Sequence, residues 1–324
     1  MCGGRGQIID GSRGAAVAVR AVRPEDDPPR LAALLAAVEA VDGGGEDTSE
    51  HAVRETMVWP GHDPRRDRWV VEGPGRPDHL IAHGFVWKGT QDKHADIVVA
   101  VHPAWRRGLG RALLASALER ARGLDATAAR AYADESHPAA APFLRGHGFT
   151  PVAAYTEMRF PDGHMPPRPA FPDRYQVRTY DNVRDLTLLA RAMTDAYSGL
   201  WGRHSVSAED LAHWLPAWRL DGVFLLFDEH ADVVGLCRAE VRELSPVEGT
   251  GRPVGYVDAP GIVPARREDD LYVPLLLTAM RWLRGQGIGS IGLESWGDDE
   301  GTLDRYRACG FTVARRAISH RLEL

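Results

Sequence analysis

The sequence predicts an α/β (α+β) protein made of two tandem domains that share one order of secondary-structure elements. Three observations lead to this prediction. The chain has 324 residues, about twice the usual size of a single hydrophobic core. A proline-rich segment near the middle divides it into two halves. Segments with strand-like and helix-like spacing of apolar residues follow one another in the same order in both halves.

The proline-rich segment, PDGHMPPRPAFPD, marks the boundary between the predicted domains. It contains five prolines in thirteen residues, and proline removes backbone donors and favours extended chain. The start of the chain, MCGGRGQIIDGSRG, is rich in glycine and has no apolar core. The predicted organisation is therefore a flexible tail at 1–14, an N-terminal domain at 15–160, a linker at 161–173 and a C-terminal domain at 174–324.

The first half predicts the order β-α-α-β-β-β-α-β-α-β. The first helix begins with prolines, which suit a first helical turn, and continues with apolar residues at helical spacing. The three consecutive strands are short apolar runs bounded by turn residues. In chain order the predicted elements are strand 15–22, helix 27–41, short helix 49–57, strands 68–73, 79–87 and 95–102, helix 110–122, strand 128–133, helix 138–147 and strand 150–160.

The second half predicts the same order again, which indicates an old duplication. Ser207 is a predicted helix cap, because a serine hydroxyl accepts a bond from the free amides of a first turn. Both halves end their last helix in glycine and phenylalanine, at Gly148 and Gly310, where a left-handed residue closes the helix. The elements are strand 175–179, helix 183–197, short helix 207–215, strands 222–228, 233–244 and 254–263, helix 271–286, strand 290–295, helix 300–309 and strand 312–322.

Composition excludes several classes of function. A net charge of -6 and a pI near 6.1 argue against a nucleic-acid binder, which needs basic excess. No apolar run has the roughly 18 residues of a membrane span, and three cysteines without CxxC spacing indicate neither a disulfide framework nor a zinc site. We therefore expect a cytoplasmic protein without metal. Only two basic residues are lysines, the other 37 being arginine, which indicates high-GC coding, as in actinomycetes.

The stretch PAWRRGLGRALL, residues 103–114, is the strongest local signal. Gly108 and Gly110 let the backbone approach a ligand closely, and a helix that starts there leaves amide donors with partial positive charge. Three arginines add charge, so a diphosphate fits. A Walker loop is absent, and a dinucleotide fingerprint would need a third glycine. A tight turn with a solvated arginine pair remains an open alternative.

The second half repeats this stretch as PARREDDLYVPLLL, residues 264–277. Asp270 and Tyr272 stand at the glycine positions, with Glu268 and Asp269 before them. Carboxylates repel a diphosphate, and a tyrosine side chain obstructs close approach of the backbone. We expect this second loop to have lost the ligand.

The element order, VHPAWRRGLGRALL after the fourth strand, and a last helix ending in GF resemble the GNAT superfamily of acyl-CoA-dependent N-acyltransferases, in its tandem form, as in mycothiol synthase. The resemblance covers nearly the whole chain. It implies a mixed, mostly antiparallel sheet flanked by helices in each domain. It also implies acetyl-CoA or another acyl-CoA as co-substrate. The residues it assigns to CoA are Val99, Val101, Arg106, Arg107, Gly108, Leu109, Gly110, Arg111, Ala112 and His137.

The loop departs from the family pattern [QR]xxGx[GA] by being one residue short. Either Arg106 or Arg107 can take the place of the family's first residue. The register therefore stays open at the level of sequence.

The resemblance also points to catalytic residues. Many members use a carboxylate near the fourth strand as base and a tyrosine in the last helix as acid. Asp96 is the candidate base. Tyr306 matches the acid position, but in the second half; the first half has Leu144 there. Tyr155 is a possible substitute, and packing roles for these tyrosines remain open.

The predicted function is transfer of an acyl group from CoA, bound in the N-terminal domain, to the amine of a small molecule. The C-terminal domain is then a degenerate copy that shapes the site. Two alternatives remain. One is a mycothiol-synthase-like acetyltransferase, and the other is a non-catalytic acyl-CoA sensor or scaffold. We expect no nucleic-acid or membrane partner, and a monomer or homodimer.

Overall fold

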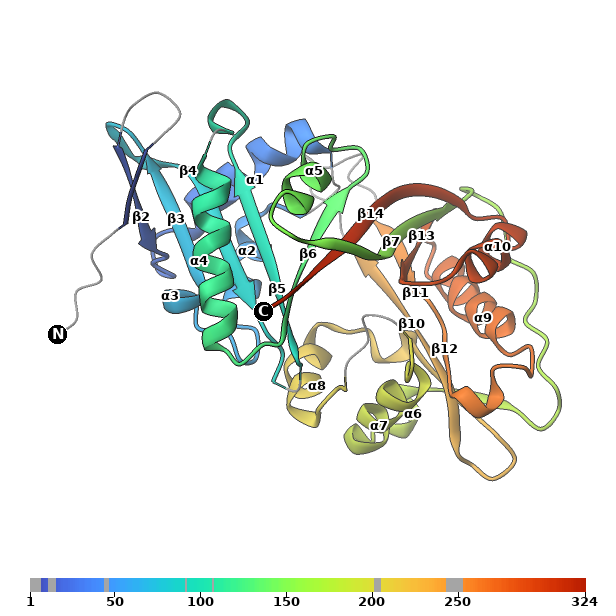
Figure 1. The fold of residues 1–324 in the computed structure, drawn as a ribbon. Coiled ribbons are helices and arrows are strands. Elements are labelled where there is room, and N and C mark those ends of the chain that lie inside the picture. Colours follow the sequence, from blue (N-terminus) through green and yellow to red (C-terminus); the bar gives the residue numbers. More distant parts are fainter. Residues whose placement is uncertain are drawn as a thin grey trace. The chain divides into compact units, whose positions relative to one another are not determined.

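The computed structural model describes residues 7–10, 16–43, 47–90, 92–106, 108–200, 205–242 and 253–324 (Figure 1). The chain divides into two compact units. Unit 1 comprises Met1–Val152 together with Ile318–Leu324, and unit 2 comprises Ala153–Ala317. Each unit is a sheet flanked by helices, as predicted.

Unit 1 follows the predicted order of elements. Ser49 caps the second helix by accepting the N–H of Ala52, and prolines open the first. The elements are β1 (Gln7–Asp10), β2 (Ala16–Ala21), α1 (Pro28–Asp42), α2 (Glu50–Met57), α3 (Pro64–Asp67), β3 (Arg68–Gly73), β4 (Arg76–Trp87), β5 (His94–Val101), α4 (Leu109–Gly123), β6 (Ala128–Asp134), α5 (Ala140–Arg145) and the start of β7 (Thr150–Phe160).

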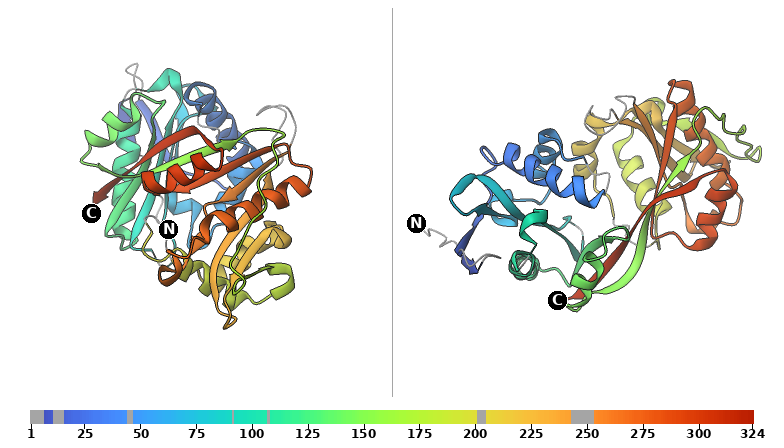
Figure 2. Two further views of the ribbon diagram at one scale, coloured as in Figure 1. Left: turned by 90° about the vertical axis from the view of Figure 1, so that its right-hand side faces the viewer. Right: turned by 90° about the horizontal axis from the view of Figure 1, so that it is seen from above.

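The sheet of unit 1 has the order β1-β2-β3-β4-β5-β6. Neighbouring strands are antiparallel except β5 and β6, which are parallel. Helix α4 covers one face, where Leu109 and Leu113 pack against Val71 and Ala82. Helices α1 and α2 cover the other face (Figure 2), and their buried apolar residues form one cluster with Val70.

Unit 2 repeats this arrangement. Ser207 caps the start of the short helix, as predicted, and forms a capping box with Asp210. The elements are β8 (Gln176–Thr179), α6 (Tyr180–Val183), α7 (Leu186–Ala196), α8 (Ala208–Trp214), β9 (Val223–Phe227), β10 (Val233–Arg242), β11 (Val254–Asp258), β12 (Gly261–Ile262), α9 (Tyr272–Gly285), β13 (Ser290–Trp296), α10 (Glu300–Ala308) and the first part of β14 (Thr312–Glu323).

The sheet of unit 2 has the order β7-β13-β11-β10-β9-β8. Only β11 and β13 are parallel among the pairs with a described register. The side chains of α9 pack with Phe224 and Leu226 of β9, whereas those of α7 pack with Leu225 and Phe227. Because alternate residues of a strand face opposite sides, α9 and α7 cover opposite faces.

The compact units differ from the sequence boundaries at two strands. Most of β7 belongs to unit 2, where Tyr155–Phe160 pairs with β13. The end of β14 belongs to unit 1, where Leu322 and Leu324 join the core and Leu324 donates its N–H to the carbonyl of Thr127, at 3.0 Å. Each half thus gives part of its last strand to the other unit. Sequence pattern cannot reveal this, because a strand has the same periodicity whichever sheet edge it joins.

Three local predictions need correction. The tail predicted at 1–14 contains β1, which pairs with β2. The predicted helix 183–197 begins later, at Leu186 of α7, because Arg184 adopts the left-handed conformation and separates α7 from the short helix α6 before it. The predicted strand 254–263 is interrupted after Asp258, ahead of Pro260, a residue without a backbone donor. The predicted closing glycines are confirmed: Gly148 and Gly310 have φ of 86° and 97°.

Candidate acyl-CoA site

Strands β5 and β6 separate in the middle of unit 1. Their parallel ladder ends where Asp96 pairs with Arg130, whereas β5 stays paired with β4 as far as Val101. The next residue, His102, donates its N–H to the carbonyl of Ile81 at the start of the β4 pairing, at 2.9 Å. Since backbone groups of consecutive strand residues point to opposite edges, those of Val99 and Val101 point toward the opened edge.

The loop after β5 leads into an uncapped helix. Gly108 has φ 86° and ψ -35°, a conformation that favours glycine, and Leu109 behind it is fully buried. The start of α4 has no side-chain cap and no acidic residue in its first turn. The free N–H groups and the positive end of the helix dipole are therefore available to an anion.

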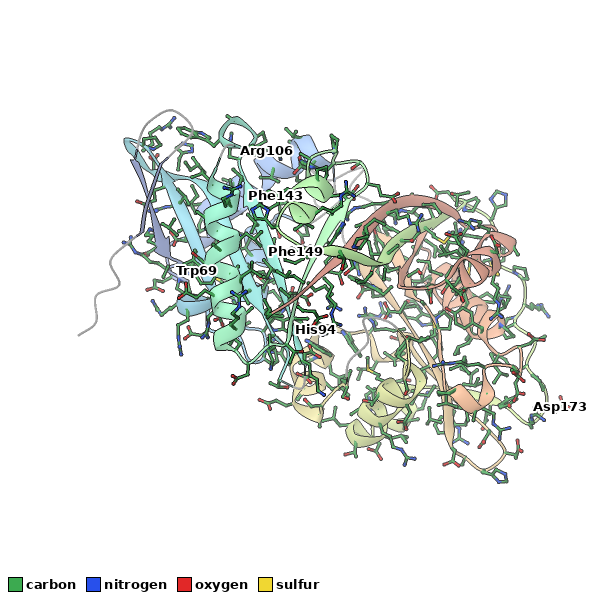
Figure 3. The ribbon with its side chains drawn as sticks, in the orientation of Figure 1. Trp69, His94, Arg106, Phe143, Phe149 and Asp173 are labelled. Carbon is green, nitrogen blue, oxygen red and sulfur yellow. The ribbon has the colours of Figure 1, made fainter. Side chains whose placement is uncertain are left out.

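Arg106, labelled in Figure 3, connects three segments of unit 1 at this loop. Its Nη2 lies 2.7 Å from both carboxylate oxygens of Asp42, at the end of α1, and its Nη1 lies 2.7 Å from Nε2 of His137. Its Nε donates to the carbonyl of Val101, at 3.3 Å. The same nitrogen of His137 is 3.2 Å from Asp42. Asp42 was not among the predicted site residues, because its contact with Arg106 spans 64 residues.

The other predicted cofactor residues lie around the same helix start. Gly110 faces Phe143 of α5: an added Cβ would be 3.5 Å from that ring, an ordinary contact. Arg111 is exposed and Ala112 half-buried. Arg107 lies outside the described residues. The structure thus gathers the described members of the predicted set around the opened edge of β5 and the start of α4.

Comparisons with known proteins identify the family. The protein-family model described as "Acetyltransferase (GNAT) family" matches residues 37–149 of this sequence. A mycothiol acetyltransferase from Nocardioides sp. is 31% identical over 295 residues, covering 87% of this chain and 94% of that protein. One from Thermobispora bispora is 30% identical over 236 residues, covering 71% and 76%. The chain belongs to the GNAT family of acetyltransferases.

Solved structures show that the GNAT fold spans both units. A GCN5-related N-acetyltransferase from Sphaerobacter thermophilus superposes with a TM-score of 0.72 at 24% identity and covers 95% of each chain. A tandem GNAT protein from the clavulanic acid biosynthesis pathway gives 0.67 at 19% identity, covering 95% of this chain and 98% of that chain. This GNAT protein is therefore an N-acetyltransferase of the tandem type, and acyl-CoA is the co-substrate of that family.

The two GNAT loops share an arginine contact but differ in length. Arg267 donates from Nε to the carbonyl of Ile262, at 3.0 Å, just as Arg106 does to Val101. Asp270 has a positive φ of 53° and precedes a buried leucine, as Gly108 does. One residue separates Arg106 from Gly108, but two separate Arg267 from Asp270. The shortening of the first loop therefore lies directly after Arg106.

In unit 2, bulkier side chains stand at the positions that correspond to the two glycines of unit 1. Tyr272, at the position of Gly110, hydrogen-bonds through its hydroxyl to that of Tyr306. Tyr306 is fully buried on α10 and donates to Asp298, at 3.0 Å. Burial raises the pKa of Tyr306 well above its usual value. The predicted general acid thus belongs to a closed hydrogen-bonded cluster that joins α9 to α10.

The other two predicted catalytic residues also have partners. Both carboxylate oxygens of Asp96 accept bonds from Arg130, at 2.6 and 2.8 Å, within unit 1. Tyr155 belongs to unit 2 and pairs with Trp296 across β7 and β13, with ring centroids 4.5 Å apart. To act on a substrate, each group must exchange or extend these contacts, and their catalytic roles stay predictions.

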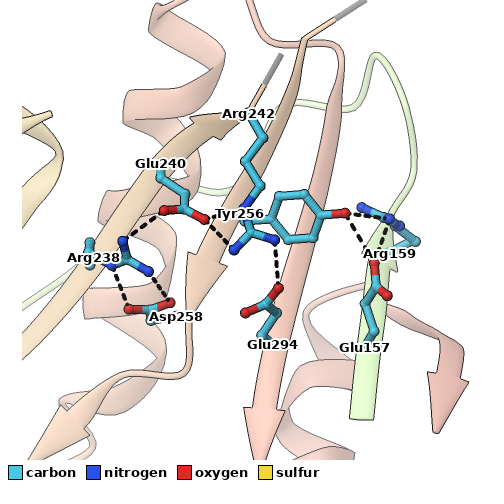
Figure 4. A network of polar contacts seen from close by, with 8 residues as sticks. All are labelled: Glu157, Arg159, Arg238, Glu240, Arg242, Tyr256, Asp258 and Glu294. Atoms are coloured by element: carbon cyan, nitrogen blue, oxygen red, sulfur yellow. Dashed lines mark hydrogen bonds and ion pairs between the residues drawn. The ribbon is translucent and has the colours of Figure 1, made fainter. Parts of the chain in front are cut away.

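A polar network crosses four strands of unit 2 (Figure 4). Arg238 is bidentate to Asp258, at 2.8 and 3.2 Å, and also donates to Glu240, at 2.7 Å. Burial raises the pKa of Glu294, which accepts from Arg242 at 2.8 Å. Further along, Arg159 donates to the hydroxyl of Tyr256, which donates to Glu157. The network thus places basic and acidic side chains alternately across these strands.

The described parts of the chain show neither a membrane-spanning helix nor a metal site. No helix there is both long and apolar enough to cross a membrane. Within the same residues, no three His, Cys, Asp or Glu side chains come together as a metal site.

Proposed function

We propose that this protein transfers an acyl group from acyl-CoA to the amine of a small molecule, and that unit 1 holds the CoA. The observation that carries this placement is Gly108. Gly108 precedes α4, and the start of this helix has no side-chain cap. The helix start follows the segment of β5 that is no longer paired with β6. Acetyl-CoA is the first donor to test. In this proposal Val99 and Val101 bond the pantetheine arm, and 106–112 with His137 hold the diphosphate end.

Unit 2 does not take a second CoA in this proposal. The position of Gly108 is occupied by Asp270, and a carboxylate at a helix start competes with a phosphate for the free amides. Tyr272 and Tyr306 occupy the adjoining region. We therefore expect one molecule of acyl-CoA per chain.

Asp96 is the proposed base for the acceptor amine. It stands at the last rung of the β5–β6 ladder, beside the opened segment of β5. To accept a proton it must release a bond to Arg130. Tyr155 and Tyr306 remain the proposed sources of a proton for the leaving thiolate.

Calorimetry with acetyl-CoA tests the placement. Wild-type protein should bind about one equivalent, and the double variant Gly108→Asp, Gly110→Asp should bind none, because two carboxylates then face the diphosphate. Gly123→Asp is the matched control, since it adds an acid at the opposite end of the same helix. Retained affinity in the double variant would overturn the assignment of the site.

A second candidate function comes from the relatives. Both mycothiol acetyltransferases above resemble most of this chain, so acetylation of a cysteinyl sugar is a specific acceptor hypothesis. Thiol release from acetyl-CoA, measured with a panel of amines that includes such a sugar, tests it. Turnover of the sugar alone supports the mycothiol-type activity. Binding of acetyl-CoA without turnover of any amine supports the sensor or scaffold alternative.

We further propose that the protein works in the cytoplasm as a monomer or homodimer. Cys237 and Cys309 are free thiols, as expected in a reducing compartment. Sedimentation of the purified protein determines the oligomeric state.

A further inference from the structure

His83 is a buried histidine at the centre of unit 1. It lies on β4, opposite Val70 of β3 and Ala100 of β5, and only 3% of its surface is exposed. The next residue, Gly84, faces α4, because an added Cβ would be 3.3 Å from Leu113. Since alternate strand residues face opposite sides, the imidazole of His83 lies on the face of α1 and α2.

Neither ring nitrogen of His83 has a hydrogen-bond partner. Leaving buried polar groups unpaired costs free energy, so such groups call for an explanation. His62, another histidine beside Phe85, differs in one nitrogen. Its Nε2 accepts a bond from Arg68, at 2.9 Å, whereas its Nδ1 makes no hydrogen bond and lies 3.4 Å from a carboxylate oxygen of Asp67. Both rings lie near Phe85, so the contrast arises within one neighbourhood.

The surroundings keep the imidazole of His83 neutral. Burial lowers its pKa to about 3, and the nearby charges of Arg68 and of protonated His62 add to this effect. A neutral imidazole offers one N–H donor and one acceptor nitrogen. It therefore complements groups that can both donate and accept, such as a hydroxyl, an amide or an uncharged amine.

The same face of the sheet is open beside His83. Val98 of β5 pairs with Phe85 and is 46% exposed, although it lies in the middle of a central strand. Val98 and Ala100 share the face of His83 and belong to the segment of β5 that has left β6. A small molecule lying over Val98 is thus beside the proposed pantetheine edge and one strand from His83.

We propose that His83 is a positioning residue for the acceptor: its imidazole hydrogen-bonds an uncharged hydroxyl, amide or amine group of a small molecule that lies over the exposed Val98. This inference rests on the proposed acyl transfer and adds a specificity element to it. An acceptor without such a group leaves both ring nitrogens unpaired and is bound less well. A permanently cationic group at this point is disfavoured by Arg68.

The first test measures stability without any ligand. His83→Leu removes an unpaired polar group from the core, so we expect the melting temperature to rise by about 2–4 °C. His62→Leu is the matched control and should lower it, because Arg68 then loses its acceptor. A fall for His83→Leu of the size seen for His62→Leu would show that the imidazole is satisfied in the free protein and would overturn the proposal.

The second test measures the acceptor. Thiol release from acetyl-CoA is followed with glucosamine, serinamide and 2-aminoethanol, and with ethylamine, which has no second polar group. With the acceptor of these three that reacts best, His83→Leu should raise KM about tenfold or more, which corresponds to the free energy of one buried hydrogen bond. The kcat and the Kd for acetyl-CoA should stay nearly unchanged. His83→Gln should restore part of this loss. KM for ethylamine should not change.

The outcomes separate this inference from the function on which it rests. An unchanged KM in His83→Leu, in a protein that turns over its acceptor, overturns the role of His83 alone. Wild-type protein that binds acetyl-CoA but turns over no amine overturns the acyl transfer and this role together. An equal loss with ethylamine would contradict the proposal, because ethylamine has no second polar group for the imidazole to bind.

Discussion

Asp42 and Arg106 form an ion pair in which both carboxylate oxygens lie 2.7 Å from one guanidinium nitrogen. The pair places a carboxylate beside the uncapped start of α4 and occupies the arginine that a diphosphate would contact. In the proposed site, binding of CoA requires Arg106 to exchange Asp42 for phosphate, or to hold both. The contact lowers the positive potential of the loop in the free protein.

Removing this carboxylate should strengthen CoA binding. In Asp42→Asn we expect the Kd for acetyl-CoA to fall several-fold, because a partly exposed ion pair contributes up to about 1 kcal/mol. Calorimetry at low salt measures it. Asp125→Asn is the control, since it removes an exposed charge just beyond the other end of α4. A higher Kd in Asp42→Asn would mean that Asp42 orients Arg106 for the ligand.

The two glycines of the loop should respond differently to alanine. Gly108→Ala places a Cβ on a residue with φ 86°, which costs about 1–2 kcal/mol of stability and distorts the loop, so we expect weaker CoA binding. Gly110→Ala meets Phe143 only at ordinary contact distance and should leave both nearly unchanged. Urea unfolding and calorimetry measure the two effects. Equal sensitivity at both positions would contradict the geometric argument.

The base assignment of Asp96 can be separated from its ion pair. If Asp96 accepts the proton, Asp96→Asn should lower kcat by about 100- to 10,000-fold with little change in the Kd for acetyl-CoA. Arg130→Met breaks the same ion pair but keeps the carboxylate. It should retain much more activity than Asp96→Asn. Equal losses in the two variants would show that Asp96 acts only by holding Arg130.

The low pKa of His83 predicts a loss of stability in mild acid. In the unfolded chain a histidine titrates near 6.5, whereas folded His83 titrates near 3, so below pH 6.5 the unfolded chain binds the extra proton. Because of this histidine, the free energy of unfolding should fall by about 2 kcal/mol between pH 7.5 and pH 5. Urea unfolding of wild type and His83→Leu at both values measures it. The variant should lose correspondingly less; an equal loss would contradict the assignment.

A variant of Tyr306 tests whether this residue has a structural or a catalytic role. In Tyr306→Phe the hydroxyl of Tyr272 loses its partner, so unfolding free energy should fall by about 1–3 kcal/mol. Because Tyr306 belongs to a closed cluster in unit 2, the Kd for acetyl-CoA should stay the same. Thermal unfolding and calorimetry measure both. Undiminished stability together with a large loss of kcat would instead support the predicted role as general acid.

The local features of the fold were predictable because their causes are local. Ser49 and Ser207 cap the helices that follow them. Gly148 and Gly310 adopt the left-handed conformation that ends a helix, and this conformation depends only on the local backbone. Apolar periodicity gave the strand at 150–160 its observed bounds. The GNAT loop was predictable for the same reason, since its glycines are adjacent in sequence to the helix that they open.

Other features depend on partners far away in the chain. The exchange of β7 and β14 between units follows from which sheet edge each strand joins, and periodicity does not encode that choice. The contact between Asp42 and Arg106 depends on where α1 ends relative to the loop. The sequence around Asp96 does not reveal its ion pair with Arg130. The two residues are 34 positions apart in the chain and meet across two parallel strands.

The sequence by itself determined the duplicated order of elements, the GNAT family and the asymmetry between PAWRRGLG and PARREDDL. Each of these depends on patterns among residues that are close together in the chain. Only the tertiary structure decided that the shortened loop lacks a residue after Arg106, that Tyr306 is buried in a cluster, and that His83 is left without partners. These are properties of packing, in which burial and geometry choose the partners of a side chain after the backbone has been placed.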